Sequence, residues 1–199
     1  LNFVRIHIKP EEPRKLYWAD KLGILVMEDM PCFWGKPDEE ARASYESEAL
    51  AVIERDFNHP SIISWVMFNE TWGLKAAGYT PVVTGDLHSK TSLYLPETQE
   101  WVRGIYRWAK QLDPTRLIED NSPVNQDHVE TDINSWHFYI NGYEAVRDHV
   151  NEVVERTFPG SDFNYIGGNV QTDAPLMNSE CGNVWGIIGG AGDSDLAWH

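Results

Sequence analysis

Two glutamates directly follow predicted buried strands, a placement that suits acid–base and nucleophilic chemistry. Glu70 comes after the apolar run at 62–68 and is preceded by Asn69, whereas Glu180 follows the shorter run at 174–178. Two carboxyl groups that face each other across a cleft can protonate a glycosidic oxygen and attack an anomeric carbon. Burial and mutual repulsion are expected to raise the pKa of one of them, so that it serves as the acid.

Further polar side chains stand at the same end of every predicted strand. They are Arg5 and His7; Glu28 and Asp29; Asn69 and Glu70; Glu119, Asp120 and Asn121; His137 and Tyr139; Asn178 and Glu180. Converging carboxylates do not stabilise a core, so this arrangement favours a functional site. Arg5 is the cation that would hold one carboxylate ionised. For His137 and Tyr139, packing on a strand is an equal alternative, and for the other acids a structural role is favoured.

The elements that would position these groups alternate along the chain. Runs at 2–8, 24–27, 62–68, 116–119, 133–139 and 174–178 predict strands. Amphipathic stretches at about 13–22, 41–57, 97–112 and 143–154 predict helices. Such alternation indicates a parallel α/β sheet, open or closed. The turn at 9–13 contains no glycine, unlike the Gly-rich first turn of a doubly wound sheet, so a closed barrel is favoured.

We therefore predict an α/β (β/α)8 TIM barrel in truncated form, with about strands 2 to 7 present. A complete barrel needs roughly 250 residues, and this chain has 199. It begins at Leu1 inside a predicted strand and stops at His199 without a terminal helix, so we expect residues 1–199 to be a partial barrel domain. Cut sheet edges favour self-association, which leaves a homo-oligomer as an open alternative.

Composition limits the partners of the chain. It carries 16 Lys and Arg against 31 Asp and Glu, a formal net charge of −15, which disfavours nucleic acid and anionic membranes. Nine tryptophans and 42% hydrophobic residues exclude a disordered segment. The longest apolar run, at 62–68, is far shorter than the roughly 18 residues that a membrane span requires. Two cysteines make no disulfide scaffold and indicate no cellular compartment.

Motifs of other chemistries are missing from the sequence. It has no His-x-His, His-Glu-x-x-His, Cys-x-x-Cys, Gly-x-Ser-x-Gly or Gly-x-x-x-x-Gly-Lys pattern. We therefore predict no cofactor and no metal, and we disfavour a metal-dependent barrel hydrolase. Three tryptophans in predicted loops, Trp34, Trp72 and Trp185, are candidates for stacking on sugar rings, with packing as an equal alternative.

The residues around Glu70 carry a family resemblance. The block Asn-His-Pro-Ser-Ile-Ile-Ser-Trp-Val-Met-Phe-Asn-Glu at 58–70 closely resembles the acid/base signature of glycoside hydrolase family 2, which includes β-galactosidases, β-glucuronidases and β-mannosidases. Segment 20–29 resembles the preceding helix and strand, and Arg5-Ile6-His7 resembles the arginine-bearing strand. Ser-Glu-Cys-Gly at 179–182 is similar to the nucleophile motif, although the family more often has an aromatic residue in place of Cys181.

The resemblance covers essentially the whole chain and implies a retaining β-glycosidase. In that assignment Glu70 is the general acid/base, and Glu180 is the nucleophile. The implied substrate-binding residues are Asn69 at the sugar 2-hydroxyl, Tyr139 and Arg5 at the nucleophile, and His137 and Trp185 along the sugar pocket. The implied partner is a carbohydrate with a neutral β-linked sugar, by default a galactoside, and the flanking β-sandwich domains of the family are absent. A non-catalytic carbohydrate-binding module or an inactive barrel fragment is the alternative.

Overall fold

A computed structural model describes residues 2–35, 37–75, 94–123, 127–140 and 142–182. Within these ranges the strands are β1 (Phe3–Ile6), β2 (Leu25–Asp29), β3 (Ile62–Val66), β4 (Leu117–Glu119), β5 (Asn134–Phe138) and β6 (Leu176–Cys181). The helices are α1 (Pro13–Leu22), α2 (Glu39–Asp56), α3 (Pro96–Leu112) and α4 (Tyr143–Arg156). Every predicted element is therefore found.

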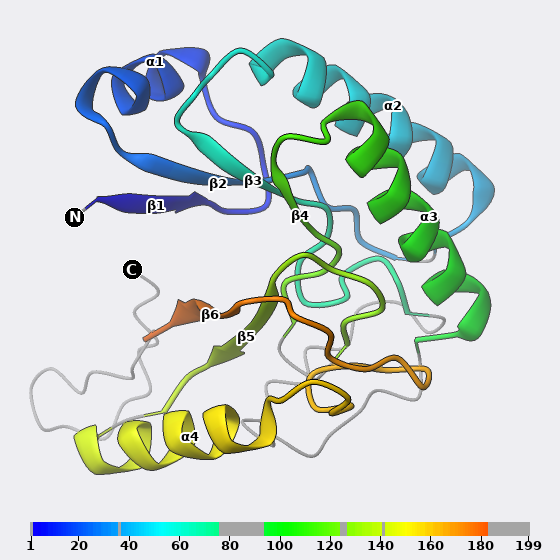
Figure 1. The fold of residues 1–199 in the computed structure, drawn as a ribbon. Coiled ribbons are helices and arrows are strands. Elements are labelled where there is room, and N and C mark those ends of the chain that lie inside the picture. Colours follow the sequence, from blue (N-terminus) through cyan, green and yellow to red (C-terminus); the bar gives the residue numbers. More distant parts are fainter. Residues whose placement is uncertain (1, 36, 76–93, 124–126, 141, 183–199) are drawn as a thin grey trace, which may run out of the picture.

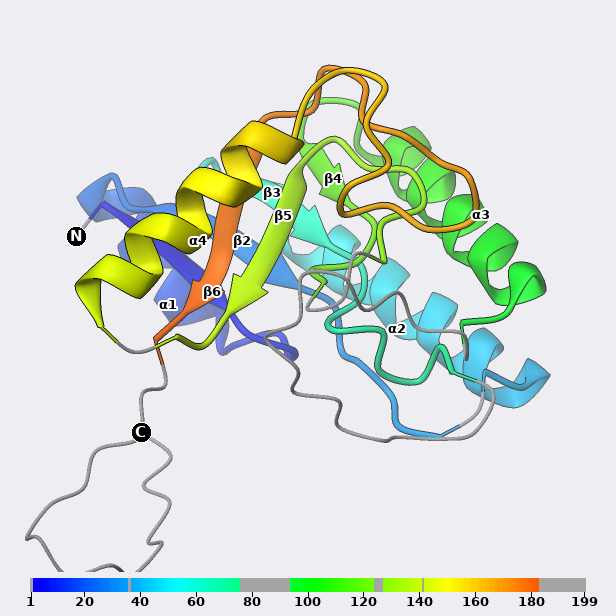
Figure 2. The same ribbon diagram turned by 90° about the horizontal axis from the view of Figure 1, so that it is seen from below.

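All strand pairings in the described part of the chain are parallel. β1, β2, β3 and β4 form one sheet in that order, and β5 pairs with β6 in a second. Helices α1, α2 and α3 cover the first sheet, and α4 lies on the opposite side of the molecule, against β5 and β6 (Figure 1). The view from below shows α4 lying along these two strands (Figure 2). This is the partial TIM barrel that the alternation of elements predicts.

The helix boundaries follow local chemistry. Pro13 opens α1 at a position where no intrahelical N–H is needed, and Gly23 closes it in the left-handed conformation, with φ of 70°. The side chain of Asp38 caps α2 by accepting from the backbone N–H of Ala41 at 2.9 Å. These local signals explain where α1 and α2 begin and where α1 ends.

Apolar side chains pack on both faces of the first sheet. The interior of the barrel holds a cluster contributed by five strands or their ends. Its members are Phe3, Met27, Val66, Ile133 and Met177. The outer face packs on the helices through Leu16, Ala49, Trp65 and Val102, among others. Burial on both faces explains why the strands have continuous apolar sequence rather than an alternating one.

One connection departs from the regular alternation. β4 and β5 are joined by residues 120–133, in which no helix forms between the described residues. Asp120 organises this segment, because its Oδ2 accepts from the backbone N–H groups of Val129 and Glu130 at 2.6 and 3.1 Å. The carboxylate thereby replaces the hydrogen bonds that a helix would supply. As for membrane association, none of the described helices has both the length and the apolar character that crossing a bilayer demands.

Candidate active site

The end of β3 delivers Glu70 through an unusual turn. Glu70 and Thr71 both have positive φ, 49° and 60°, which costs energy for residues other than glycine. The turn is held from the neighbouring segment: Ser122 accepts from the backbone N–H of Glu70 at 2.9 Å, and Asn121 accepts from that of Thr71 at 3.0 Å. A strained conformation that its surroundings enforce fixes the direction of the Glu70 side chain.

Glu70 and Glu180 come together, as the sequence predicts. Three atoms lie within 4.8 Å of one another: a carboxylate oxygen of Glu70, a carboxylate oxygen of Glu180 and a ring nitrogen of His137. The hydroxyl of Tyr139 lies between the two acids, 3.0 Å from Glu70 Oε1 and in shorter contact with Glu180 Oε1. Because a phenol has one hydrogen, it can donate to only one of the two carboxylates at a time. The pair is therefore coupled through Tyr139.

Arg5 organises the floor of the site. Its guanidinium donates from Nε and Nη2 to both oxygens of Asp29, at 2.9 and 2.7 Å. Nη1 reaches Glu180 Oε2 at 3.3 Å, as expected from the resemblance. Burial opposes charge on both partners, but their attraction and hydrogen bonds raise the pKa of Arg5 and lower that of Asp29. Asp29 thus fixes the arginine that faces Glu180.

His137 holds Glu70 rather than simply lining a pocket. Its Nε2 faces Nη1 of Arg5 at 3.1 Å, and since arginine only donates, Nε2 must accept. The proton of the neutral ring is therefore assigned to Nδ1, which lies 2.8 Å from Glu70 Oε1. The contacts of His137 and Tyr139 thus engage one oxygen of Glu70. Oε2 is the oxygen of Glu70 that these two contacts leave for a substrate.

The pKa of Glu70 differs from the expectation that burial raises it. Burial does act in that direction, but the hydrogen bonds from His137 and Tyr139 outweigh it and lower the pKa below its ordinary value. In the unliganded site Glu70 is thus the carboxyl group that these donors hold ionised. The sequence could not show this, because His137 is 67 residues away from Glu70.

Asn69 is fully buried beside the pair. Its Oδ1 accepts from Arg5 Nη2 at 2.8 Å, so the amide Nδ2 is the group that needs another partner. Nδ2 has no hydrogen-bond partner within the described part of the chain. A buried N–H without an acceptor is costly, and a ligand oxygen would satisfy it.

Other predicted strand-end acids are not brought to the pair. Glu28 is buried on the opposite face of β2 from Asp29, near Asp56 and Arg55; burial and the charge of Asp56 raise its pKa to about 8. Asp120 organises its own loop. Glu119 is buried and accepts from Ser135. Trp185 lies outside the described residues, so its place in the sugar pocket stays a prediction.

Two serines in the site were missed by sequence reasoning. The hydroxyl of Ser122 lies 2.9 Å from His137 Nε2 and 2.8 Å from the hydroxyl of Ser179. Together they join the ends of β4, β5 and β6 below the carboxyl pair. No motif marks either residue, because a serine before a proline or in a polar strand end is common in loops.

The cluster also has donor atoms suited to a cation, since Glu70, His137 and Glu180 could each supply one ligand. The guanidinium of Arg5 opposes such binding. It lies 3.1 Å from His137 and 3.3 Å from Glu180, and its fixed positive charge disfavours a second cation at that distance.

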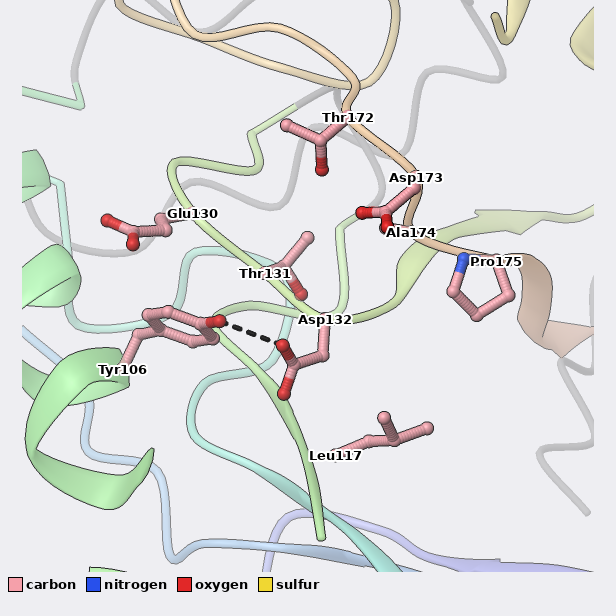
Figure 3. Close-up of a pocket in the computed structure, with 9 residues that line it drawn as sticks. All are labelled: Tyr106, Leu117, Glu130, Thr131, Asp132, Thr172, Asp173, Ala174 and Pro175. Atoms are coloured by element: carbon pink, nitrogen blue, oxygen red, sulfur yellow. Dashed lines mark hydrogen bonds between the residues drawn. The ribbon is translucent and has the colours of Figure 1, made fainter. Parts of the chain in front are cut away.

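The opposite end of the strands has a different character. A hollow of about 390 Å³ there is lined by Tyr106, Leu117, Glu130, Thr131, Asp132, Thr172, Asp173, Ala174 and Pro175. Figure 3 shows Tyr106 directed toward Asp132, whose Oδ1 accepts from the tyrosine hydroxyl at 2.8 Å. Lys110 neutralises the same carboxylate at 2.6 Å. Asp132 is thus already paired with the helix beside it.

Known proteins resemble the chain in sequence and fold. The family described as glycosyl hydrolases family 2, TIM barrel domain, matches residues 1–191. A β-galactosidase of Thermoanaerobacterium thermosulfurigenes is 39% identical over 72 residues, which are 36% of this chain and 10% of that protein. A β-glucuronidase of Bacteroides fragilis is 27% identical over 168 residues, 79% of this chain and 21% of that protein.

Among solved structures, the crystal structure of a GH2 β-galacturonidase from Eisenbergiella tayi bound to galacturonate is similar in fold. It has a TM-score of 0.64 and 21% sequence identity, and the match covers 90% of this chain and 29% of that one. The matches therefore cover less than a third of the length of each of these relatives.

Proposed function

Because this chain belongs to the TIM-barrel domain family of the family 2 glycosyl hydrolases, we propose that it carries the catalytic centre of a retaining β-glycosidase. Glu70 acts as general acid and base, and Glu180 acts as nucleophile. The observation that carries the proposal is the closeness of the two carboxyl groups, whose oxygens approach within 4.8 Å. Retaining enzymes have carboxyl groups about 5–5.5 Å apart, whereas inverting enzymes need about 6.5–9.5 Å to admit a water molecule.

Glu70 must take up a proton when the substrate binds, because the unliganded site holds it ionised. In the first step, Glu180 then attacks the anomeric carbon while Glu70 gives this proton to the glycosidic oxygen. The bond to the leaving group breaks, and an ester forms between the sugar and Glu180. Glu70 Oε2 is the atom suited to this transfer, because His137 and Tyr139 occupy Oε1. Nδ2 of Asn69 would donate to a hydroxyl of the sugar, a contact that strengthens as positive charge develops on the ring.

In the second step, Glu70 takes a proton from water, and the water oxygen displaces Glu180 from the sugar. Ester formation removes the charge of Glu180, so the single hydrogen of Tyr139 is freed to donate to Glu70. That change, together with the lost repulsion between the carboxylates, lowers the pKa of Glu70 when it must act as a base. Tyr139, in contact with both acids, would thus couple the two half-reactions.

The proposed substrate is a neutral β-linked sugar, with a galactoside as the first to assay. Arg5, the cation in contact with the pair, already serves Asp29, Asn69 and Glu180, so it has little capacity left for a sugar carboxylate. We also propose that the natural protein has further domains, including flanking β-sandwiches. This is supported by the small share of the relatives' length, 10% and 21%, that the chain matches.

A panel of aryl β-glycosides tests the proposal on the full-length natural protein. We expect hydrolysis of at least one galactoside, glucuronide or mannoside with retention of anomeric configuration. Glu180→Gln should abolish it, and Glu28→Gln, at a carboxyl buried on the other face of β2, should not. Sugar binding without hydrolysis of any member would support the non-catalytic alternative, and equal loss in both variants would overturn the assignment of Glu180.

A further inference from the structure

Two tryptophans form a stacked pair at the edge of the site. Trp34 follows β2 and Trp72 follows β3; their ring centroids are 4.4 Å apart, with an interplanar angle of 27°. Trp34 is 54% exposed. Two stacked indoles, one of them more than half exposed, offer a broad apolar surface to a ligand.

The backbone around the pair is built to bring the two loops together. Gly73 has φ of 71°, and a Cβ there would lie 2.5 Å from the carbonyl oxygen of Phe33. Only glycine permits this approach, which presses the loop of Trp72 against the loop of Trp34. Phe33 is itself fixed against the ring of Tyr45, at 6.0 Å between centroids. The stacking of the indoles is therefore a consequence of buried contacts beneath them.

His7 connects this pair to the carboxyl groups. Its ring meets Trp72 edge-on at 6.1 Å between centroids. Nδ1 of the same ring lies 3.6 Å from Asp29 and 3.9 Å from Glu180. Trp72 is also only two residues beyond Glu70 in the chain. The indole pair thus borders the reacting centre, and Trp72 belongs to the segment after β3 that also carries the general acid.

We propose that Trp34 and Trp72 bind the sugar ring on the leaving-group side of the cleaved bond. This inference rests on the proposed function, in which Glu70 protonates the glycosidic oxygen and must therefore stand beside the leaving group. A sugar-binding surface on that side implies that the substrate is a disaccharide or an oligosaccharide, with a second pyranose ring as the leaving group. During the second step the same surface can bind an acceptor sugar.

A pyranose suits the surface better than a plain aryl group does. One face of such a ring is made of C–H groups, which pack on indole, while its hydroxyls require polar partners at the rim. His7, half-exposed and beside Trp72, supplies a polar partner of this kind. The charge of −15 on the chain further favours a neutral ring over an anionic one.

The test compares substrates that differ only in the leaving group. In the full-length protein we expect Trp34→Ala to lower kcat/KM for a β-disaccharide about tenfold, the size of a lost aromatic contact. The same variant should change kcat/KM for the corresponding glycosyl fluoride less than about twofold, because fluoride is too small to reach the pair. Trp18→Ala is the matched control, since this tryptophan on α1 is 53% exposed.

Three results would overturn the proposal: an equal loss on both substrates, no loss on the disaccharide, or a loss confined to aryl glycosides. If the unmodified protein hydrolyses nothing, the proposed function fails, and a binding measurement decides this inference separately. Calorimetric titration of the disaccharide into Glu180→Gln, with and without Trp34→Ala, should then show binding that weakens about tenfold. Equal affinity in the two variants would contradict it.

Discussion

The two ends of the strands are both rich in charged residues, but they use them differently. At the amino ends, acids are neutralised by nearby cations: Lys110 binds Asp132 at 2.6 Å and Arg116 binds Asp113 at 2.5 Å. At the carboxyl ends, the contacts of Glu70 with His137 and Tyr139 engage only Oε1, and Asn69 Nδ2 has no hydrogen-bond partner among the described residues. Paired charges stabilise a fold, whereas groups left for a ligand indicate where chemistry takes place.

The largest expected difference between the ends is in activity. Glu180→Gln should lower kcat by at least about a thousandfold, since it removes the nucleophile. Its effect on the free energy of unfolding should be small, because the repulsion with Glu70 is lost together with the contact to Arg5. Rates on an aryl glycoside and urea unfolding curves measure the two quantities. Full activity in this variant would contradict the role of the carboxyl ends.

A change in the floor of the site should cost stability as well. Arg5→Met leaves Asp29 buried without its cation, and we expect a loss of about 3–5 kcal/mol in the free energy of unfolding. The double variant Arg5→Met, Asp29→Leu should recover much of it, because the buried carboxylate of Asp29 is then removed together with its cation, and Glu180, which also loses Arg5, is partly exposed. Urea unfolding of the two variants provides the measurement. A single variant as stable as the double one would show that the ion pair is not coupled.

The two faces of β2 can be compared through Glu28. Its pKa of about 8 lies above the ordinary value of 4.5, so the folded state binds the extra proton between these pH values. Stability should therefore fall as pH rises from about 4.5 to 8, and Glu28→Gln should remove that slope. At pH 8 we expect Glu28→Gln to have a free energy of unfolding larger than that of the unmodified protein, by on the order of 2–4 kcal/mol.

The control for this experiment is Glu54→Gln, at an exposed glutamate on α2, the helix that also carries Asp56 beside Glu28. It should leave the pH dependence of unfolding as it is. A slope that persists in Glu28→Gln would mean that another group binds the proton.

A smaller effect is expected from His137. Removing its hydrogen bond to Glu70 in His137→Phe should raise the pKa of Glu70, because one of the donors that hold the carboxylate ionised is lost. Because the active form requires protonated Glu70, the alkaline limb of kcat/KM should move to higher pH. His137→Asn, whose amide can still donate, should restore the original position. An unchanged limb in His137→Phe would show that His137 has only a packing role.

The smallest effect belongs to the amino ends. Asp132→Asn weakens the contacts with Lys110 and Tyr106, and we expect a loss of about 1 kcal/mol in the free energy of unfolding with unchanged kcat. Thermal unfolding and an aryl-glycoside assay measure both. A drop in kcat comparable to that of Glu180→Gln would remove the distinction between the two ends.

Sequence patterns predicted the order and direction of the elements because buried parallel strands and capped helices leave local signals. They did not separate Glu28 from Asp29. Adjacent residues on a strand must face opposite sides, but both faces of β2 are buried, so polarity does not reveal which residue points inward. The pKa of Glu70 could not be predicted from the sequence either. It depends on the donor His137 in β5 and on which nitrogen of the imidazole ring carries the proton.

β5 and β6 form a sheet separate from the first, so the site also lies at a junction between two sheets. Side chains that we assign to chemistry, such as Tyr139 and His137, also join the two sheets through Glu70 and Arg5. A ligand bound there would contact residues of both sheets and so stabilise their association. The melting temperature should therefore rise on ligand binding, and substitutions in the site that change substrate specificity should also change how cooperatively the two sheets unfold.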